Sequence, residues 1–185
     1  MKFFIIHGSY GNPNENWIPW LKENLEKEGH NVIVPQFPLN ENQNLENWMN
    51  VIKPYFNHID SQTIFIGHSI GPAFILSILE KIKTNIRACF LVSGFLGLLN
   101  NEKFDEVNKI FTTKDFDWKK IKENCRNFYI FHSDNDPYVP FEKAEQLSKK
   151  LNVKVIVIPN GGHLNTSAGY TRFPELLNKI KEELN

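Results

Sequence analysis

The chain alternates short apolar runs with helical patterns, and this alternation limits its fold more than any other feature. Six apolar runs of strand length are predicted at residues 3–7, 31–34, 63–66, 87–92, 128–131 and 153–158. Helical patterns are predicted at residues 15–28, 45–59, 72–83, 104–111, 141–151 and 173–184. Continuous apolar strands joined by helices are typical of a parallel sheet with both faces covered. We therefore predict an α/β protein, a three-layer α/β/α sandwich around a mainly parallel six-stranded sheet.

Composition narrows the class of protein further. The 185 residues suit one domain, residues 1–185, and Lys plus Arg balances Asp plus Glu at 21 each. Without a basic excess we expect no nucleic-acid partner. The N-terminal apolar stretch is too short for a signal peptide, no run reaches transmembrane length, and two cysteines make no disulfide framework. We expect a cytoplasmic protein that has no membrane contact, and nothing indicates a protein partner.

The third apolar run leads into the motif Gly67-x-Ser69-x-Gly71, and a helical pattern starts at Pro72. This strand–turn–helix arrangement is typical of a nucleophile elbow, which holds a serine hydroxyl above the edge of a sheet. The two glycines let neighbouring backbone pass close by, and the following helix points its N-terminal amides at the serine. The motif also occurs in ordinary Gly-rich turns, but its context favours Ser69 as a nucleophile.

A serine nucleophile needs a general base, and the base needs an acid that orients it. Among six histidines, His163 follows the sixth apolar run and a flexible Asn-Gly-Gly turn, which predicts that it lies at the same sheet edge as Ser69. Asp134 and Asp136 follow the fifth run, and both are candidates for the acid. Asp136 precedes a rigid Pro-Tyr-Val-Pro turn, and Asp134 is the candidate to cap that turn.

An oxyanion hole is expected beside the serine. One N–H would come from Ile70, directly after the nucleophile, and a second from the loop after the first run, with Ser9 preferred over Tyr10. His7, at the end of that run, is expected to brace this loop. His132 is expected to be a core histidine with a satisfied hydrogen bond.

Two questions stay open at this point. The segment 93–120 either roofs the site and lines an acyl pocket, or it is a packed connection with one short helix. His132, Asp134 and Asp136 are residue types that bind metals, but a metal site there would explain neither the elbow nor His163. We therefore expect no metal and no cofactor.

Five short motifs span nearly the whole chain. They are His7-Gly8-Ser9 with Asn16-Trp17, Gly67-His68-Ser69-Ile70-Gly71, Leu91-Val92-Ser93-Gly94-Phe95, Asp134-Asn135-Asp136-Pro137-Tyr138-Val139-Pro140 and Gly161-Gly162-His163. In this order they resemble the small α/β-hydrolase family of serine hydrolases that includes retinoblastoma-binding protein nine and YdeN-like proteins.

The resemblance implies a minimal α/β-hydrolase fold without a large lid domain, and a triad of Ser69, His163 and Asp136. It selects Asp136 because the acid of that fold lies four residues before a proline, here Pro140. The implied activity is hydrolysis of small or medium carboxylic esters through an acyl-enzyme, with thioesters and amides as alternatives and without a cofactor. Ile70 replaces the usual leucine, which leaves the backbone donor unchanged. The alternative function is a weakly catalytic or non-catalytic protein-binding module on the same fold.

Overall fold

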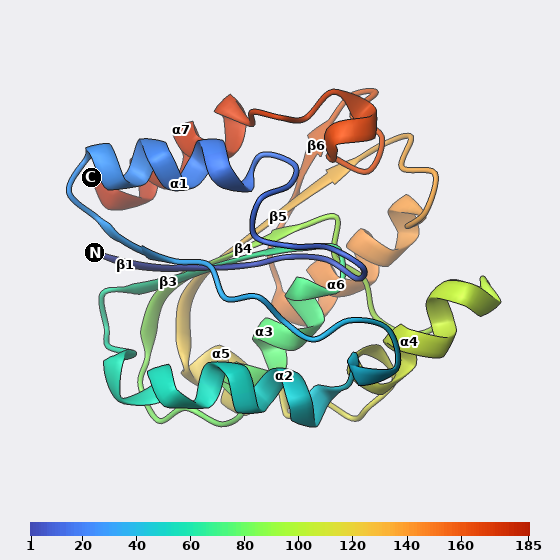
Figure 1. Ribbon diagram of the computed structural model, residues 1–185, viewed down its shortest axis with the longest axis horizontal. Coiled ribbons are helices and arrows are strands. Elements are labelled where there is room, and N and C mark those ends of the chain that lie inside the picture. Colours follow the sequence, from blue (N-terminus) through green and yellow to red (C-terminus); the bar gives the residue numbers. More distant parts are fainter.

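One six-stranded parallel sheet organises the computed structural model, which describes residues 1–185 (Figure 1). The strands are β1 (Lys2–Ile6), β2 (Asn31–Ile33), β3 (Thr63–His68), β4 (Ile86–Val92), β5 (Cys125–Ser133) and β6 (Val155–Ile158). Their order is β2-β1-β3-β4-β5-β6, and all five neighbouring pairs are parallel. The predicted fold class is confirmed.

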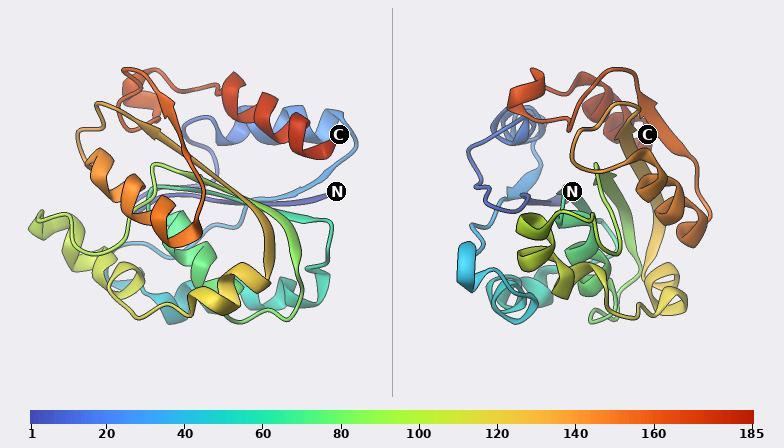
Figure 2. Two further views of the ribbon diagram at one scale, coloured as in Figure 1. Left: turned by 180° about the vertical axis from the view of Figure 1, so that it is seen from behind. Right: turned by 90° about the vertical axis from the view of Figure 1, so that its right-hand side faces the viewer.

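Helices cover both faces of this sheet. They are α1 (Ile18–Lys27), α2 (Leu45–Ile52), α3 (Gly71–Leu79), α4 (Glu102–Thr112), α5 (Trp118–Glu123), α6 (Phe141–Leu151) and α7 (Pro174–Leu184). Three short 3-10 helices, η1 (Asn40–Asn42), η2 (Lys53–His58) and η3 (Thr166–Ala168), complete the elements. Helices α1 and α7 lie on one face, and α2, α3, α5 and α6 lie on the other (Figures 1 and 2).

Two apolar cores follow from this layering, one on each side of the sheet. Alternate strand residues point to opposite faces, so Phe3 and Ile5 of β1 belong to the core under α1 and α7, and Phe4 and Ile6 belong to the other. The cores hold 19 and 28 buried residues respectively, so the larger one lies on the α3 side. Helix α3 is buried along its whole length because it packs between this sheet face and the outer helices.

The structure differs from the predicted elements in three places. The second helix ends at Ile52 and continues as η2, where Pro54 cannot donate to an α-helical ladder. Helix α5 was not predicted, because its six residues bury only Ile121 and show no periodicity. Strand β5 begins at Cys125, three residues before the predicted start at residue 128, and this cysteine is buried.

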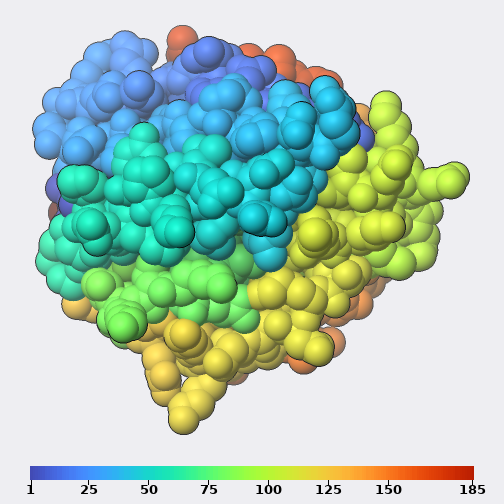
Figure 3. Space-filling model, turned by 60° about the horizontal axis from the view of Figure 1, so that its bottom comes forward, coloured from blue at the N-terminus to red at the C-terminus, as the bar shows by residue number.

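The segment 93–120 begins at the carboxyl end of β4 and leads away to the C-terminal end of α3, where the N–H of Asp117 donates to Glu80. Helix α4 projects from the body of the molecule, where its yellow-green segment stands out in the space-filling view (Figure 3). Phe111 near its C-terminal end is fully buried in the larger core and anchors it there. The N-terminal half of α4 is left free to border the sheet edge.

No helix of this chain has the length and apolar character needed to cross a bilayer.

Candidate active site

Ser69 lies at the tight turn between β3 and α3. Its φ is 60°, in the left-handed region that side chains other than glycine rarely adopt. A Cβ on Gly71 would lie 2.8 Å from the carbonyl oxygen of Ile6, and one on Gly67 would lie 2.7 Å from the backbone nitrogen of Pro72. Both glycines are therefore required by close backbone packing, and the turn has the geometry that the sequence predicts.

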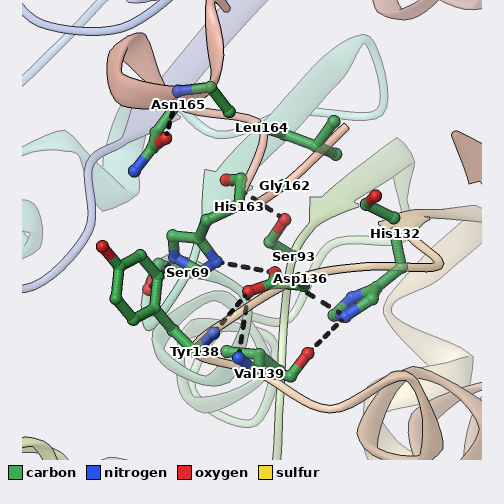
Figure 4. Close-up of polar contacts among 12 residues, drawn as sticks. Ser69, Ser93, His132, Asp136, Tyr138, Val139, Gly162, His163, Leu164 and Asn165 are labelled. Atoms are coloured by element: carbon green, nitrogen blue, oxygen red, sulfur yellow. Dashed lines mark hydrogen bonds and ion pairs between the residues drawn. The ribbon is translucent and has the colours of Figure 1, made fainter. Parts of the chain in front are cut away.

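Three side chains from separate loops form a continuous chain of hydrogen bonds (Figure 4). His163 Nε2 lies 3.1 Å from Ser69 Oγ, and His163 Nδ1 lies 2.7 Å from Asp136 Oδ2. The carboxylate can only accept, so Nδ1 carries the proton and Nε2 accepts from the serine hydroxyl. The structure thus brings together the serine, histidine and aspartate that the sequence singles out, and it selects Asp136 over Asp134.

Asp136 is held by backbone on the side away from His163. Its Oδ1 accepts hydrogen bonds from the N–H groups of Tyr138 (2.9 Å) and Val139 (3.0 Å). Burial pushes the pKa of Asp136 upward, but His163 and these two N–H groups outweigh it and hold the pKa below its usual value. The carboxylate is therefore ionised and fully buried beside the imidazole.

Asp134 has a different task from the one expected. Its Oδ1 accepts from the N–H of Asn160 at 2.7 Å, so it fastens the turn after β6 and does not cap the Pro-Tyr-Val-Pro turn. Ser133 and Asn135 bind the next two N–H groups of the same turn, Gly161 and Gly162, each at 2.8 Å. Three consecutive side chains at the end of β5, from Ser133 to Asn135, thus hold the segment that presents His163.

A second support for His163 comes from the N-terminal part of the chain. The indole of Trp17 donates to the carbonyl of Leu164 at 3.0 Å, and Asn16 Oδ1 accepts from the N–H of Thr166 at 2.8 Å. The motif Asn16-Trp17 therefore fixes the loop on the far side of the histidine.

The other buried histidines lie around the site without joining the hydrogen-bond chain. His7 donates from Nδ1 to the carbonyl of Gly8 and accepts at Nε2 from the N–H of Phe37, so it braces the loop after β1 as expected. His68 donates to the carbonyl of His163 at 2.9 Å. His132 donates to the carbonyl of Val139, but its Nδ1 is buried without a partner, so only half of its expected hydrogen bonding is satisfied.

Backbone donors are available next to Ser69. The N–H groups of Ser9, Tyr10 and Ile70 have no acceptor within the protein. Gly8 and Ser9 line the pocket at Ser69, whereas Tyr10 does not. This placement favours Ser9 over Tyr10 as the second donor.

A pocket of about 220 Å³ opens above Ser69 and His163. Its apolar lining includes Phe95, Leu99 and Phe104 from the segment 93–120, so this segment does border the site. Phe104 of α4 also packs edge-on against Tyr138, with ring centroids 5.8 Å apart, and Tyr138 packs edge-on against His163. The polar lining includes Ser9, Glu15, Asn16, Asn108 and Asn165.

Comparison with known proteins places the chain in a family. Residues 3–182 match the serine hydrolase family. The chain belongs to this family. It is 29% identical to YdeN of Bacillus subtilis, over 92% of this chain and 90% of that protein, and 26% identical to the serine hydrolase RBBP9 of Rattus norvegicus, over 99% and 95% respectively.

Solved structures agree with this assignment. The crystal structure of the B. subtilis ydeN gene product superposes with a TM-score of 0.91 at 27% identity, covering 99% of this chain and 98% of that one. Polyneuridine aldehyde esterase, at 14% identity, superposes with a TM-score of 0.73 over 100% and 99% of the two chains, which shows a shared α/β-hydrolase fold alone.

Some pocket residues of this serine hydrolase belong to no recognisable sequence motif. Glu15, Phe104, Asn108 and Asn165 reach the pocket only through the tertiary fold. Asn108 did leave a sequence signal, because it shares the buried side of α4 with Phe111 and Thr112, where an amide is unexpected. No group of three or more His, Cys, Asp or Glu side chains is arranged to hold a metal ion.

Proposed function

We propose that this serine hydrolase cleaves small carboxylic esters through an acyl-enzyme on Ser69, with His163 as general base and Asp136 as the acid that orients it. The observation that carries the proposal is the unbroken hydrogen-bond chain from Ser69 Oγ through His163 to Asp136 Oδ2. Its geometry gives the serine a base within hydrogen-bond reach and gives the base a fixed tautomer.

In the first half-reaction, Ser69 Oγ attacks the carbonyl carbon as its proton moves to His163 Nε2. Asp136 stabilises the imidazolium that forms. The imidazolium then gives its proton to the leaving alcohol as the tetrahedral intermediate collapses to the acyl-enzyme. In the second half-reaction, water loses a proton to His163 and attacks the acyl carbon. The imidazolium then gives this proton to Ser69 Oγ as the acyl–Oγ bond breaks, which releases the acid and restores Ser69.

The negative charge that develops on the carbonyl oxygen in the tetrahedral intermediate is stabilised by hydrogen-bond donors that are already in position. The unpaired N–H groups of Ile70 and Ser9 are assigned this task, with Tyr10 as a second choice for the loop donor. Each such donor typically lowers the barrier by about 3 kcal/mol. His7 supports the loop donor indirectly, because it holds the carbonyl of Gly8.

The pocket limits the size of the substrate. A volume of about 220 Å³ suits a short acyl or alcohol group and leaves no room for a long chain inside the site. We propose esters rather than amides as substrates because an ester needs less assistance to expel its leaving group. Thioesters remain within the same chemistry.

Covalent labelling tests the proposal. A fluorophosphonate should phosphonylate the wild type at Ser69, and Ser69→Ala should remain unlabelled. Ser77→Ala is the matched control, because Ser77 is a buried serine of α3 whose hydroxyl only contacts the carbonyl of Ala73. This control should label at the wild-type rate.

The same labelling experiment distinguishes the proposed hydrolase from the alternative function. A wild type that labels no faster than Ser69→Ala, although it is folded, would contradict the hydrolase proposal and favour a binding module on this fold. Hydrolysis of p-nitrophenyl butyrate by the wild type, abolished in Ser69→Ala, would support the ester assignment.

A further inference from the structure

Asn108 is a buried amide in the projecting helix α4. Its residue is only 2% exposed, although asparagine is a weak helix former and an amide is costly to bury without partners. It lies beside Phe111 and Thr112, the other two buried residues of the helix. A side chain of this kind in the middle of a helix needs a physical reason.

The oxygen of this amide accepts hydrogen bonds from Ser9, in the loop after β1, and from Gln43. Asn108 Oδ1 accepts from the hydroxyl of Ser9 at 2.5 Å and from Gln43 Nε2 at 3.0 Å. Gln43 donates its second N–H to Ser9 Oγ at 3.0 Å, which closes a three-membered network. Both contacts are made to the oxygen of Asn108, so neither Ser9 nor Gln43 uses its Nδ2.

The NH₂ group of the Asn108 amide has no partner in the protein. Asn108 Nδ2 makes no hydrogen bond, and it is not one of the two enclosed orphan atoms, which are Gln43 Oε1 and His132 Nδ1. It therefore keeps contact with solvent, and Asn108 lines the pocket above Ser69. Two N–H bonds are thus free on a residue that lines the pocket.

We propose that Asn108 Nδ2 donates a hydrogen bond to an oxygen of the substrate other than the scissile carbonyl, and that this serine hydrolase therefore selects esters with an uncharged oxygen in the acyl or alcohol group. The inference rests on the proposed function. A purely structural role would require only the oxygen of the amide, because Ser9 and Gln43 both donate to it.

The rest of the lining agrees with an uncharged oxygen as the acceptor. Glu15 lines the same pocket, and burial raises the pKa of its carboxyl group. A carboxylate on the substrate would meet this half-buried acid, so ether, hydroxyl and ketone oxygens fit better than an anionic group. The pocket therefore offers the substrate polar groups as well as the apolar side chains of Phe95, Leu99 and Phe104.

Two isosteric substrate pairs test the proposal. In the acyl pair, p-nitrophenyl methoxyacetate is compared with p-nitrophenyl butyrate, and in the alcohol pair, 2-methoxyethyl butyrate is compared with butyl butyrate. Each pair exchanges one CH₂ for an ether oxygen. Intrinsic reactivity cancels when each variant is compared with the wild type on the same ester.

Asn108→Asp keeps an oxygen for Ser9 and Gln43 but loses the two N–H bonds, and it is assayed at pH 8 to keep the carboxyl group ionised. We expect kcat/KM for the ether ester of at least one pair to fall about tenfold more than for its hydrocarbon partner, because the hydrogen bond to the ether oxygen is lost. Asn108→Leu should show the same selective loss, on top of a loss common to all four esters.

Asn101→Asp is the matched control, because Asn101 caps the same helix from an exposed position and aspartate caps equally well. It should change no kcat/KM by more than about twofold. An equal loss on both members of both pairs, or no loss in Asn108→Asp, would overturn the inference while wild-type ester hydrolysis still upheld the proposed function. A wild type inactive on all four esters would contradict both.

Discussion

Asp136 uses its two carboxylate oxygens for different purposes. Oδ2 accepts a hydrogen bond from the protonated Nδ1 of His163, and Oδ1 accepts hydrogen bonds from two backbone N–H groups of the turn that follows. The acid is therefore oriented by main chain, which has less freedom to move than a side-chain partner would have. Asp134, two residues earlier, contacts only the N–H of Asn160.

Replacing each aspartate by asparagine should separate these two tasks. In Asp136→Asn, an amide N–H would face His163 Nδ1, which favours the tautomer that donates to Ser69 instead of accepting from it. We expect kcat/KM to fall about 10³- to 10⁴-fold. Asp134→Asn keeps an oxygen for Asn160 and should lose less than about threefold.

Steady-state hydrolysis of p-nitrophenyl butyrate measures both variants. Comparable losses in the two would show that Asp136 is not the acid of the triad.

At the scale of elements, apolar patterns predicted all six strands, because a parallel strand buried on both faces is a continuous apolar run. Errors arose where polar residues extend an element or where an element is too short to show a period. Arg126 and Asn127 are exposed strand residues that concealed the start of β5, and Lys-rich α5 buries only Ile121.

The site was predictable to the extent that its residues lie in local motifs. Ser69, Asp136 and His163 each follow a strand and sit in a recognisable turn. The network of Ser9, Gln43 and Asn108 could not be predicted, because its members are 34 and 65 residues apart along the chain and no local pattern relates them. They come together only in the folded protein, where Ser9 and Gln43 meet Asn108 of α4.

The contact between β1 and the start of α3 makes a sharp prediction about Gly71. In Gly71→Ala the new Cβ would lie 2.8 Å from the Ile6 carbonyl oxygen, so the elbow must move away from β1. We expect the free energy of unfolding to fall by about 1–3 kcal/mol and the labelling of Ser69 to slow.

Gly29→Asn provides the comparison for Gly71→Ala. Gly29 also needs a positive φ of 80°, but a Cβ added there would meet no atom within 4 Å, and asparagine tolerates this region. Its unfolding free energy, measured by urea titration, should change by less than about 1 kcal/mol. Equal stability of Gly71→Ala and the wild type would contradict the close-packing account of the elbow.

At the scale of the whole molecule, three buried histidines link stability to pH. Burial, together with repulsion from His163, lowers the pKa of His68 to about 3, and burial lowers the pKa values of His7 and His132. Below about pH 6.5 the unfolded chain takes up protons that the folded protein excludes. The free energy of unfolding should therefore fall as pH decreases through and below this value.

His68, with its pKa of about 3, should by itself remove about 1 kcal/mol of stability between pH 7 and pH 5.5, and His7 and His132 should add to this loss. Urea titrations at the two pH values measure the difference. His132→Gln should make the pH dependence shallower, because it removes one group whose pKa burial lowers. An unfolding free energy that is independent of pH over this range would contradict the buried neutral histidines.

Activity of the single and double variants of Ser69 and His163 tests most directly whether these side chains act as one unit. Ser69→Ala and His163→Ala should each lower kcat/KM for p-nitrophenyl butyrate by about 10⁴-fold or more, and the double variant should lose no more than about threefold beyond either. Losses that multiply in the double variant, or a single variant that keeps a tenth of wild-type activity, would contradict a shared nucleophile and base.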